Sequence, residues 1–309
     1  MAYPLPTEHE RRALFGWLEQ ASSLTAWRWV YSYNQLFVES VRSVYEEEQR
    51  TAGLKQTIPS QWFSDVLRGQ DAFDAALVRL QGGDRRCFDF LGSRGHFNEG
   101  LLPVEWWQDM YHGAMFGRNG FGIDASPRWP EIESAMYNCV SALSDIRVVL
   151  QNRFTDVPAP IHDLRIYTST NAKSLIKWWL GRKELPPVPI ADPEVLVPTG
   201  QVVPCYGIWE PVQVTAIGSE ALLTARPASP PPNRPLDGCM NYLHAGAAAP
   251  TIAFEGDGQR REGRPTTWRL LWGDSRYGHN GVPPNERNYV FISPVEETDP
   301  AALPGSSAP

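Results

Sequence analysis

Apolar residues recur every three or four positions through the first half of the chain, and this spacing predicts α-helices. The predicted helices cover residues 14–21, 25–52, 60–81, 103–115, 130–154 and 171–180. The spacing is most regular in 130–154, where steps of four and three alternate, as in a helix that packs lengthwise against others. We therefore expect a helical domain over residues 1–185.

Two residues are suited to begin predicted helices. Thr25 precedes a long apolar face, and a threonine hydroxyl at this position can accept an N–H of the first turn. Pro103 fits the first turn of a helix, because the N–H that proline lacks would have no partner there. We expect helices to start at both positions.

The pattern changes near residue 185. Prolines interrupt the following stretch, which favours an extended connector over residues 186–198. Short β-like runs then alternate with Gly, Pro and Asn turns, at residues 202–214, 221–225, 240–244, 266–272 and 288–292. They predict a small antiparallel sheet or barrel over 199–296, and hence an α+β fold. Residues 227–235 read as a surface loop or a polyproline-type peptide ligand, and 297–309 as a disordered tail.

The charge of the chain limits its partners. A net charge of -7 and an isoelectric point near 5.5 disfavour nucleic acid and anionic membranes, which require basic surfaces. A basic partner would be attracted, although mild acidity also serves solubility alone. The opening residues carry charge where a signal peptide needs an apolar core, and no stretch is long enough to span a membrane. We expect a cytoplasmic protein with reduced cysteines.

The search for chemistry yields only weak candidates. The six histidines and four cysteines are scattered without metal-ligand spacing, so we predict neither metal nor cofactor. Gly113–Gly122 is glycine-rich and holds an arginine, but lacks the Lys-Ser/Thr ending of a phosphate-binding loop. Cys205 could act as a nucleophile with His244 as its base, or be a structural cysteine. An enzyme, for example a hydrolase that reverses a toxin's modification, stays as the alternative to a binding protein.

Tryptophans and acids are the candidate partner-binding residues. Adjacent positions on a helix point about 100° apart, so one ring of each Trp pair can enter the core while the other faces solvent, unless both fill the interior. A run of three glutamates at a helix end could attract a basic partner or be a solvated helix end. The candidates are Glu46, Glu47, Glu48, Trp106, Trp107, Trp178 and Trp209.

Two stretches at the start and two in the C-terminal part resemble a known group of proteins. RRALFGWLE at 11–19 and SSLTAWR at 22–28 are similar to the opening of immunity proteins of bacterial polymorphic toxin systems, families seventy-one and seventy-two. PCYGIWEPV at 204–212 and PTTWRLLW at 265–272 resemble the small β module of such proteins. The resemblance implies a cofactor-free cytoplasmic inhibitor that occludes a toxin, often a type VI secretion effector.

Overall fold

The computed structural model describes residues 5–51, 56–90, 95–115, 122, 126–150, 178–191, 194–213, 236–255 and 261–291. These residues form two compact units, and each unit combines two separate stretches of the chain. The sheet unit contains Met1–Ala21 and Gln151–Ser275, and the helical unit contains Ser22–Leu150 and Arg276–Pro309. The predicted α+β class is confirmed, with helices mostly in the first half and an antiparallel sheet in the second.

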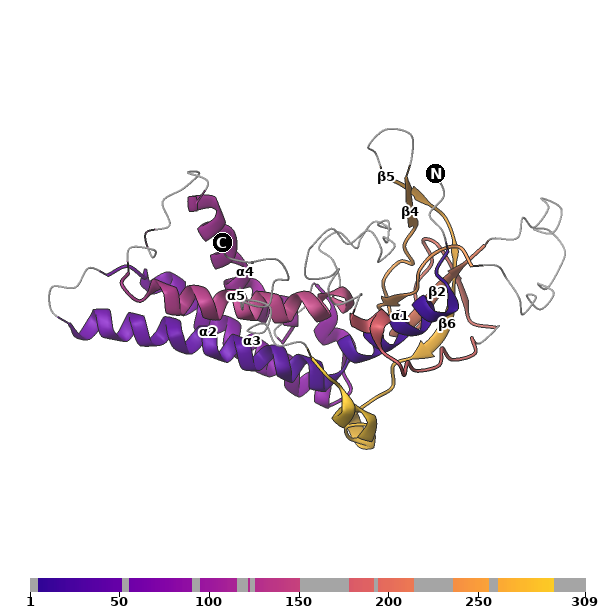
Figure 1. The fold of residues 1–309 in the computed structure, drawn as a ribbon, viewed down its shortest axis with the longest axis horizontal. Helices are drawn as coiled ribbons and strands as arrows, with labels where there is room; N and C mark the ends of the chain where they lie inside the picture. Colours follow the sequence, from indigo (N-terminus) through magenta and orange to yellow (C-terminus); the bar gives the residue numbers. More distant parts are fainter. Residues whose placement is uncertain are drawn as a thin grey trace, which may run out of the picture. The chain divides into compact units, whose positions relative to one another are not determined.

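Four helices build the helical unit: α2 (Leu24–Arg50), α3 (Ser60–Gln81), α4 (Phe97–Met115) and α5 (Trp129–Ile146). Figure 1 shows α2, α3 and α5 running lengthwise beside one another. The apolar seam predicted for the last of these helices is buried, at Ile132, Met136, Cys139, Leu143 and Ile146. The predicted periodicity is therefore correct as far as Ile146. There α5 ends and a 3-10 helix follows at Arg147–Val149, so the predicted helix end at residue 154 is wrong. No helix among the described residues is both long and apolar enough to cross a membrane.

Aromatic rings fill the centre of the helical unit. The Trp27 ring stacks on Phe97 with 3.9 Å between centroids, and Phe73 and Phe88 surround the pair. All four side chains are fully buried. Because large rings supply much of the buried apolar area in a core, this cluster is a main source of the unit's stability.

Helices α3 and α4 approach closely because each of them has a glycine that faces the other helix. A methyl group on Gly100 would lie 2.8 Å from Cβ of Phe73, and one on Gly69 would lie 2.6 Å from the ring of Pro103. Pro103 lies inside α4, so our prediction that it starts the helix is wrong. The helix begins six residues earlier, and the proline ring fills the space beside Gly69.

The N-terminus of α2 is fixed by residues from both ends of the unit. Ser23, and not Thr25 as predicted, is the N-cap, since its side chain accepts the N–H of Ala26 at 3.0 Å. Thr25 instead donates its hydroxyl to the carboxylate of Glu286 at 2.7 Å. The phenol oxygen of Tyr277 accepts the N–H of Leu24 at 2.6 Å. The segment after Ser275 is thereby part of the helical unit.

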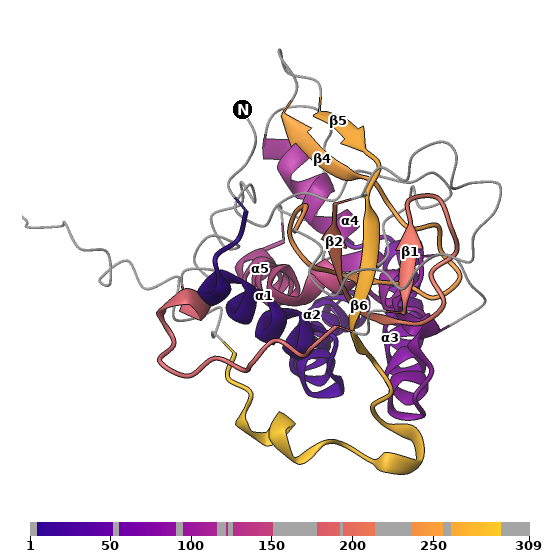
Figure 2. The ribbon, with the colours of Figure 1, turned by 90° about the vertical axis from the view of Figure 1, so that its right-hand side faces the viewer.

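The sheet unit contains a four-stranded antiparallel sheet in the order β1-β6-β2-β3. Its strands are β1 (Leu196–Pro198), β2 (Gly207–Val212), β3 (Asn241–Leu243) and β6 (Thr267–Gly273). Figure 2 shows β6 between β1 and β2. A separate hairpin joins β4 (Ile252–Glu255) to β5 (Arg261–Arg264).

Several predicted strands differ from those observed. β1 lies within the predicted connector. The predicted strand 288–292 is wrong over its described residues, because Asn288 ends a 3-10 helix at Pro284–Asn288 and irregular chain follows up to residue 291. The predicted strand 221–225, the loop 227–235 and the tail 297–309 lie outside the described residues, as do most of 171–180 and 116–121.

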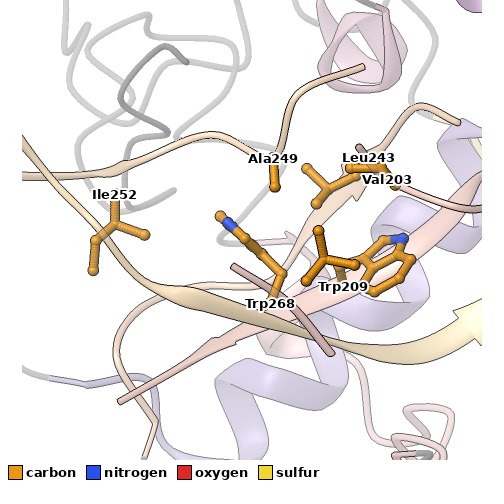
Figure 3. Packing of buried hydrophobic residues seen from close by; sticks show 7 residues of the cluster. Val203, Trp209, Leu243, Ala249, Ile252 and Trp268 are labelled. Carbon is orange, nitrogen blue, oxygen red and sulfur yellow. The ribbon is translucent and has the colours of Figure 1, made fainter. Parts of the chain in front are cut away.

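Two tryptophans form the core of the sheet unit (Figure 3). Trp209 of β2 and Trp268 of β6 are fully buried among Val203, Leu243 and the neighbouring aliphatic side chains. The indole N–H of Trp268 donates to the Pro250 carbonyl oxygen at 2.8 Å. The first residue of β2 must be glycine, because a Cβ on Gly207 would lie 2.2 Å from the Trp272 carbonyl oxygen.

Helix α1 (Glu8–Ala21) packs in the sheet unit although it precedes the helical domain in sequence. Arg11 and Arg269 both bind the buried carboxylate of Glu210, each at 2.7 Å. The ring of Phe15 meets Trp272 edge-on at 6.4 Å. The observed units thus differ from the ranges 1–185 and 199–296, whose separate packing stays a prediction.

Candidate partner-binding surface

Partly exposed aromatic rings gather at one end of the helical unit. Tyr45 of α2 stacks on Phe63 of α3 with 4.2 Å between ring centroids. Trp62, also on α3, meets Trp106 of α4 edge-on at 4.7 Å. The end of α2, the start of α3 and the second half of α4 therefore adjoin.

The second half of α4 also adjoins the start of α5. The ring of Tyr111 lies 4.8 Å from that of Trp129, and Nε2 of His112 is 3.0 Å from the hydroxyl oxygen of Tyr137. Burial raises the pKa of Tyr137 above its ordinary value, and the negative charge of Glu133 raises it further. The Tyr137 hydroxyl is therefore protonated at neutral pH. We call this region the aromatic end, defined by its partly exposed rings Tyr45, Trp62, Phe63, Trp106, Tyr111 and Tyr137.

The tryptophan pair on α4 divides between core and surface. Trp107 is fully buried and meets Phe37 edge-on at 5.5 Å, whereas Trp106 is 38% exposed. Of the two arrangements that the sequence left open, this pair has the one in which one ring faces inward and the other outward. Trp107 itself is a core residue in this structure.

The remaining candidate tryptophans lie in the sheet unit. Trp179 is buried against Gly16, whereas Trp178 is partly exposed under the guanidinium of Arg182 at 5.1 Å. Trp209 is fully buried in the sheet core. Of these candidates, only Trp178 has surface to offer a partner.

The run of three glutamates does not share one surface. Glu48 is buried, and its carboxylate accepts the N–H of Thr57 at 2.9 Å, so it fixes the chain that leads into α3. Glu46 and Glu47 are exposed. Consecutive helical positions diverge by about 100°, and this rotation turns the third acid inward.

An arginine joins the ends of α2 and α5. The guanidinium of Arg128 lies 2.6 Å from Glu131 and 2.8 Å from Glu47, and these bonds raise the pKa of Arg128. The same bond to Arg128 lowers the pKa of the Glu131 carboxyl. Exposed ion pairs of this kind add little to stability.

The outer face of α4 combines apolar and acidic side chains. Leu102, Trp106 and Asp109 follow one another at steps of four and three, and all three are exposed. Neither Asp109 nor Trp62 is among the residues that were predicted from the sequence to bind a partner. The helical spacing of Asp109 from Trp106 was the signal that could have placed it on the same face.

The candidate nucleophile is poorly suited to its chemistry. Burial raises the pKa of the Cys205 thiol, which disfavours the reactive thiolate. His244 is buried, with the rings of Tyr206 and Tyr242 edge-on at 5.9 and 5.7 Å. Across the described residues, no group of His, Cys, Asp and Glu side chains could hold a metal ion. Most of the candidate loop Gly113–Gly122 lies outside these residues.

Comparison with known families gives this surface a context. Residues 5–160 match the family model of Immunity protein 71. The chain belongs to this immunity-protein family. Residues 187–291 match the model of a second family, Immunity protein 72. Neither the comparison with curated proteins nor that with solved structures found a match.

The two matches confirm the resemblance seen in the sequence and assign the chain a general role. As a member of an immunity-protein family, the chain has a toxin as its expected partner and neutralisation of that toxin as its task. The Immunity protein 71 match contains α1 to α5, and so the whole aromatic end. The Immunity protein 72 match contains the sheet and the segment up to residue 291.

Proposed function

We propose that this chain neutralises a cognate antibacterial toxin by binding its toxin domain one to one in the cytoplasm and covering it. The family match over 5–160 is the observation that carries the proposal. The aromatic end supports it, because Trp and Tyr side chains at a surface are frequent anchors of protein interfaces. The toxin is a domain of a secreted effector, such as one delivered by type VI secretion.

Binding alone is sufficient for this task. A typical stable interface buries roughly 1,200–2,000 Å² in total and requires neither cofactor nor metal. The raised pKa of Cys205 is consistent with an inhibitor that performs no nucleophilic chemistry. Occlusion then depends on the affinity and amount of the inhibitor, and not on turnover.

Titration tests this mechanism. The purified chain is added in increasing amounts to the toxin domain of the effector encoded beside its gene, and residual toxin activity is measured. Inhibition should rise in proportion to the added chain and be complete near equimolar amounts. An enzyme that reverses the damage would turn over and protect at far lower amounts. Complete protection at about a tenth of the toxin's molar amount would refute occlusion.

A variant separates the two mechanisms independently. Cys205→Ser should leave inhibition unchanged, because the replacement preserves most of the side-chain volume and a binding protein needs no thiolate. The thermal unfolding midpoint serves as the control for folding. Loss of protection by a normally folded Cys205→Ser variant would favour the enzyme.

A further inference from the structure

We infer that the aromatic end binds a basic face of the toxin domain, one rich in lysine and arginine. This inference rests on the proposed function, because it names the chemistry of the partner that the chain neutralises. Three observations carry it: the balance of charges, the pairing of the arginines and the exposure of the rings.

Acids outnumber basic residues at the aromatic end. Its turns comprise residues 45–50, 56–68, 106–115 and 126–137. They carry six surface carboxylates, Glu46, Glu47, Asp65, Asp109, Glu131 and Glu133, against three arginines and, among these residues, no lysine. The seventh acid, Glu48, is buried and occupied by backbone N–H groups. Among the described residues of this end, carboxylates are therefore in excess.

All three arginines are already paired with acids of the same end. Arg50 lies 3.5 Å from Glu46, and Arg68 lies 2.6 Å from Asp65. Arg128 bridges two further glutamates. Within the described part of the chain, Asp109 and Glu133 have no such partner. Two carboxylates thus remain for cations supplied by another molecule.

The exposed rings suit the same kind of partner. Arginine and lysine bind over the faces of tryptophan and tyrosine, and these contacts strengthen as water is excluded. Trp106 projects beside Asp109 on α4, so one cationic side chain can contact a ring and a carboxylate together. A second copy of this chain is a poorer occupant, because a symmetric contact would place like charges opposite each other.

The charge contribution is measured as an association rate. The double variant Asp109→Asn with Glu133→Gln and the full chain are mixed with the toxin domain in stopped flow, from low to high salt. The double variant should associate about tenfold more slowly at low salt and show a weaker salt dependence, because steering acts on the on-rate. Asp71→Asn, which removes an exposed acid of α3 outside the aromatic end, is the control and should associate normally.

The ring contribution is measured as a dissociation rate. Trp106→Ala should dissociate about thirtyfold faster or more, since a central tryptophan is a frequent hot spot. Val78→Ala, at an exposed apolar position of α3, is its control. Trp106→Phe retains an aromatic ring, and its intermediate effect would exclude simple misfolding as the cause.

The outcomes distinguish the two proposals. If the chain does not bind the toxin domain at one to one, the proposed function fails. If it binds and protects but the Asp109, Glu133 and Trp106 variants match their controls, the proposed function stands and this inference is overturned. Slower association and faster dissociation, confined to the aromatic-end variants, would support the basic partner.

Discussion

Three buried glutamates join parts of the chain that are distant in sequence or lie across a loop. Glu210 binds Arg11 from α1, and Glu286 binds Thr25 at the start of α2. Glu48 closes the shorter span from the end of α2 to the residues before α3. A buried carboxylate is costly unless it is paired and hydrogen-bonded, so each of these acids depends on its partners. In sequence they look like surface residues, because their partners are too distant to form a local pattern.

Glu286 offers a direct test at this scale. Burial raises the pKa of Tyr277, so its hydroxyl stays protonated and can donate to the Glu286 carboxylate. Glu286→Gln weakens the charged hydrogen bonds to this hydroxyl and to Thr25, and should cost about 1–3 kcal/mol of unfolding free energy. Urea unfolding measures this loss. Glu46→Gln, at an exposed position, should unfold like the unaltered chain, and equal midpoints for both variants would contradict the assigned role.

At the scale of elements, the close contact of α3 and α4 depends on two glycines with no room for a methyl group. Gly100 faces the backbone and Cβ of Phe73, which cannot move without displacing the helix. Gly113 lies later on α4 with nothing within 4 Å of its added Cβ. One helix therefore contains both a glycine that packing requires and one that it does not.

Gly100 and Gly113 give a matched pair of variants on the same helix. Gly100→Ala should destabilise the chain by about 1–3 kcal/mol, because overpacking forces the helices apart. Gly113→Ala should be neutral or stabilise by up to about 1 kcal/mol, since alanine favours helix. Thermal and urea unfolding of both variants checks the prediction. A stabilising effect at Gly100 would mean that the two helices are farther apart than described.

The sequence predicted elements better than their ends and partners. Helical periodicity identified the buried faces of α2, α3 and α5, because burial of one face repeats with the helical turn. It misplaced the start of α4, because the closeness of Gly69 to Pro103 is a contact between helices. β1 was missed within a proline-rich stretch, since an edge strand tolerates proline and Pro198 lies at its end.

At the scale of the candidate site, the sequence predicted residue types but not the surface. It left open whether adjacent tryptophans divide between core and solvent or both lie in the core, and the structure shows Trp106 as the exposed ring of its pair. The sequence did not show that Trp62, Tyr111 and Asp109 lie at the same end of the unit. Trp62 is on a different helix from the other two, and Tyr111 and Asp109 lie on different faces of α4. Which helix ends adjoin is decided by packing over the whole unit.

At the scale of the whole molecule, each of the two units contains residues from both family matches. The Immunity protein 71 region supplies α1 to the sheet unit, and the Immunity protein 72 region supplies residues from Arg276 onward to the helical unit. The boundary between the matches is thus not a boundary between the observed units. Stability of either unit should depend on residues from both regions.

Truncation checks this dependence. Deleting residues 276–309 removes Tyr277 and Glu286 from the start of α2, and hydrogen exchange in that part of the helix should become faster. Deleting only 292–309 is the control and should leave exchange unchanged. Equal protection of α2 in the longer truncation and the full chain would instead support 1–185 as a separately folding range.

The chain passes between its two units after Ala21, Leu150 and Ser275. This path has an evolutionary consequence. Recombination between related genes at the junction of the family regions would exchange one region and leave α1 without Glu210, and α2 without Glu286, unless the incoming region restored both contacts. We expect lineages to inherit the two regions together. New toxin specificities would then arise by substitutions on exposed positions such as Trp106 and Asp109, while the linking residues stay constant.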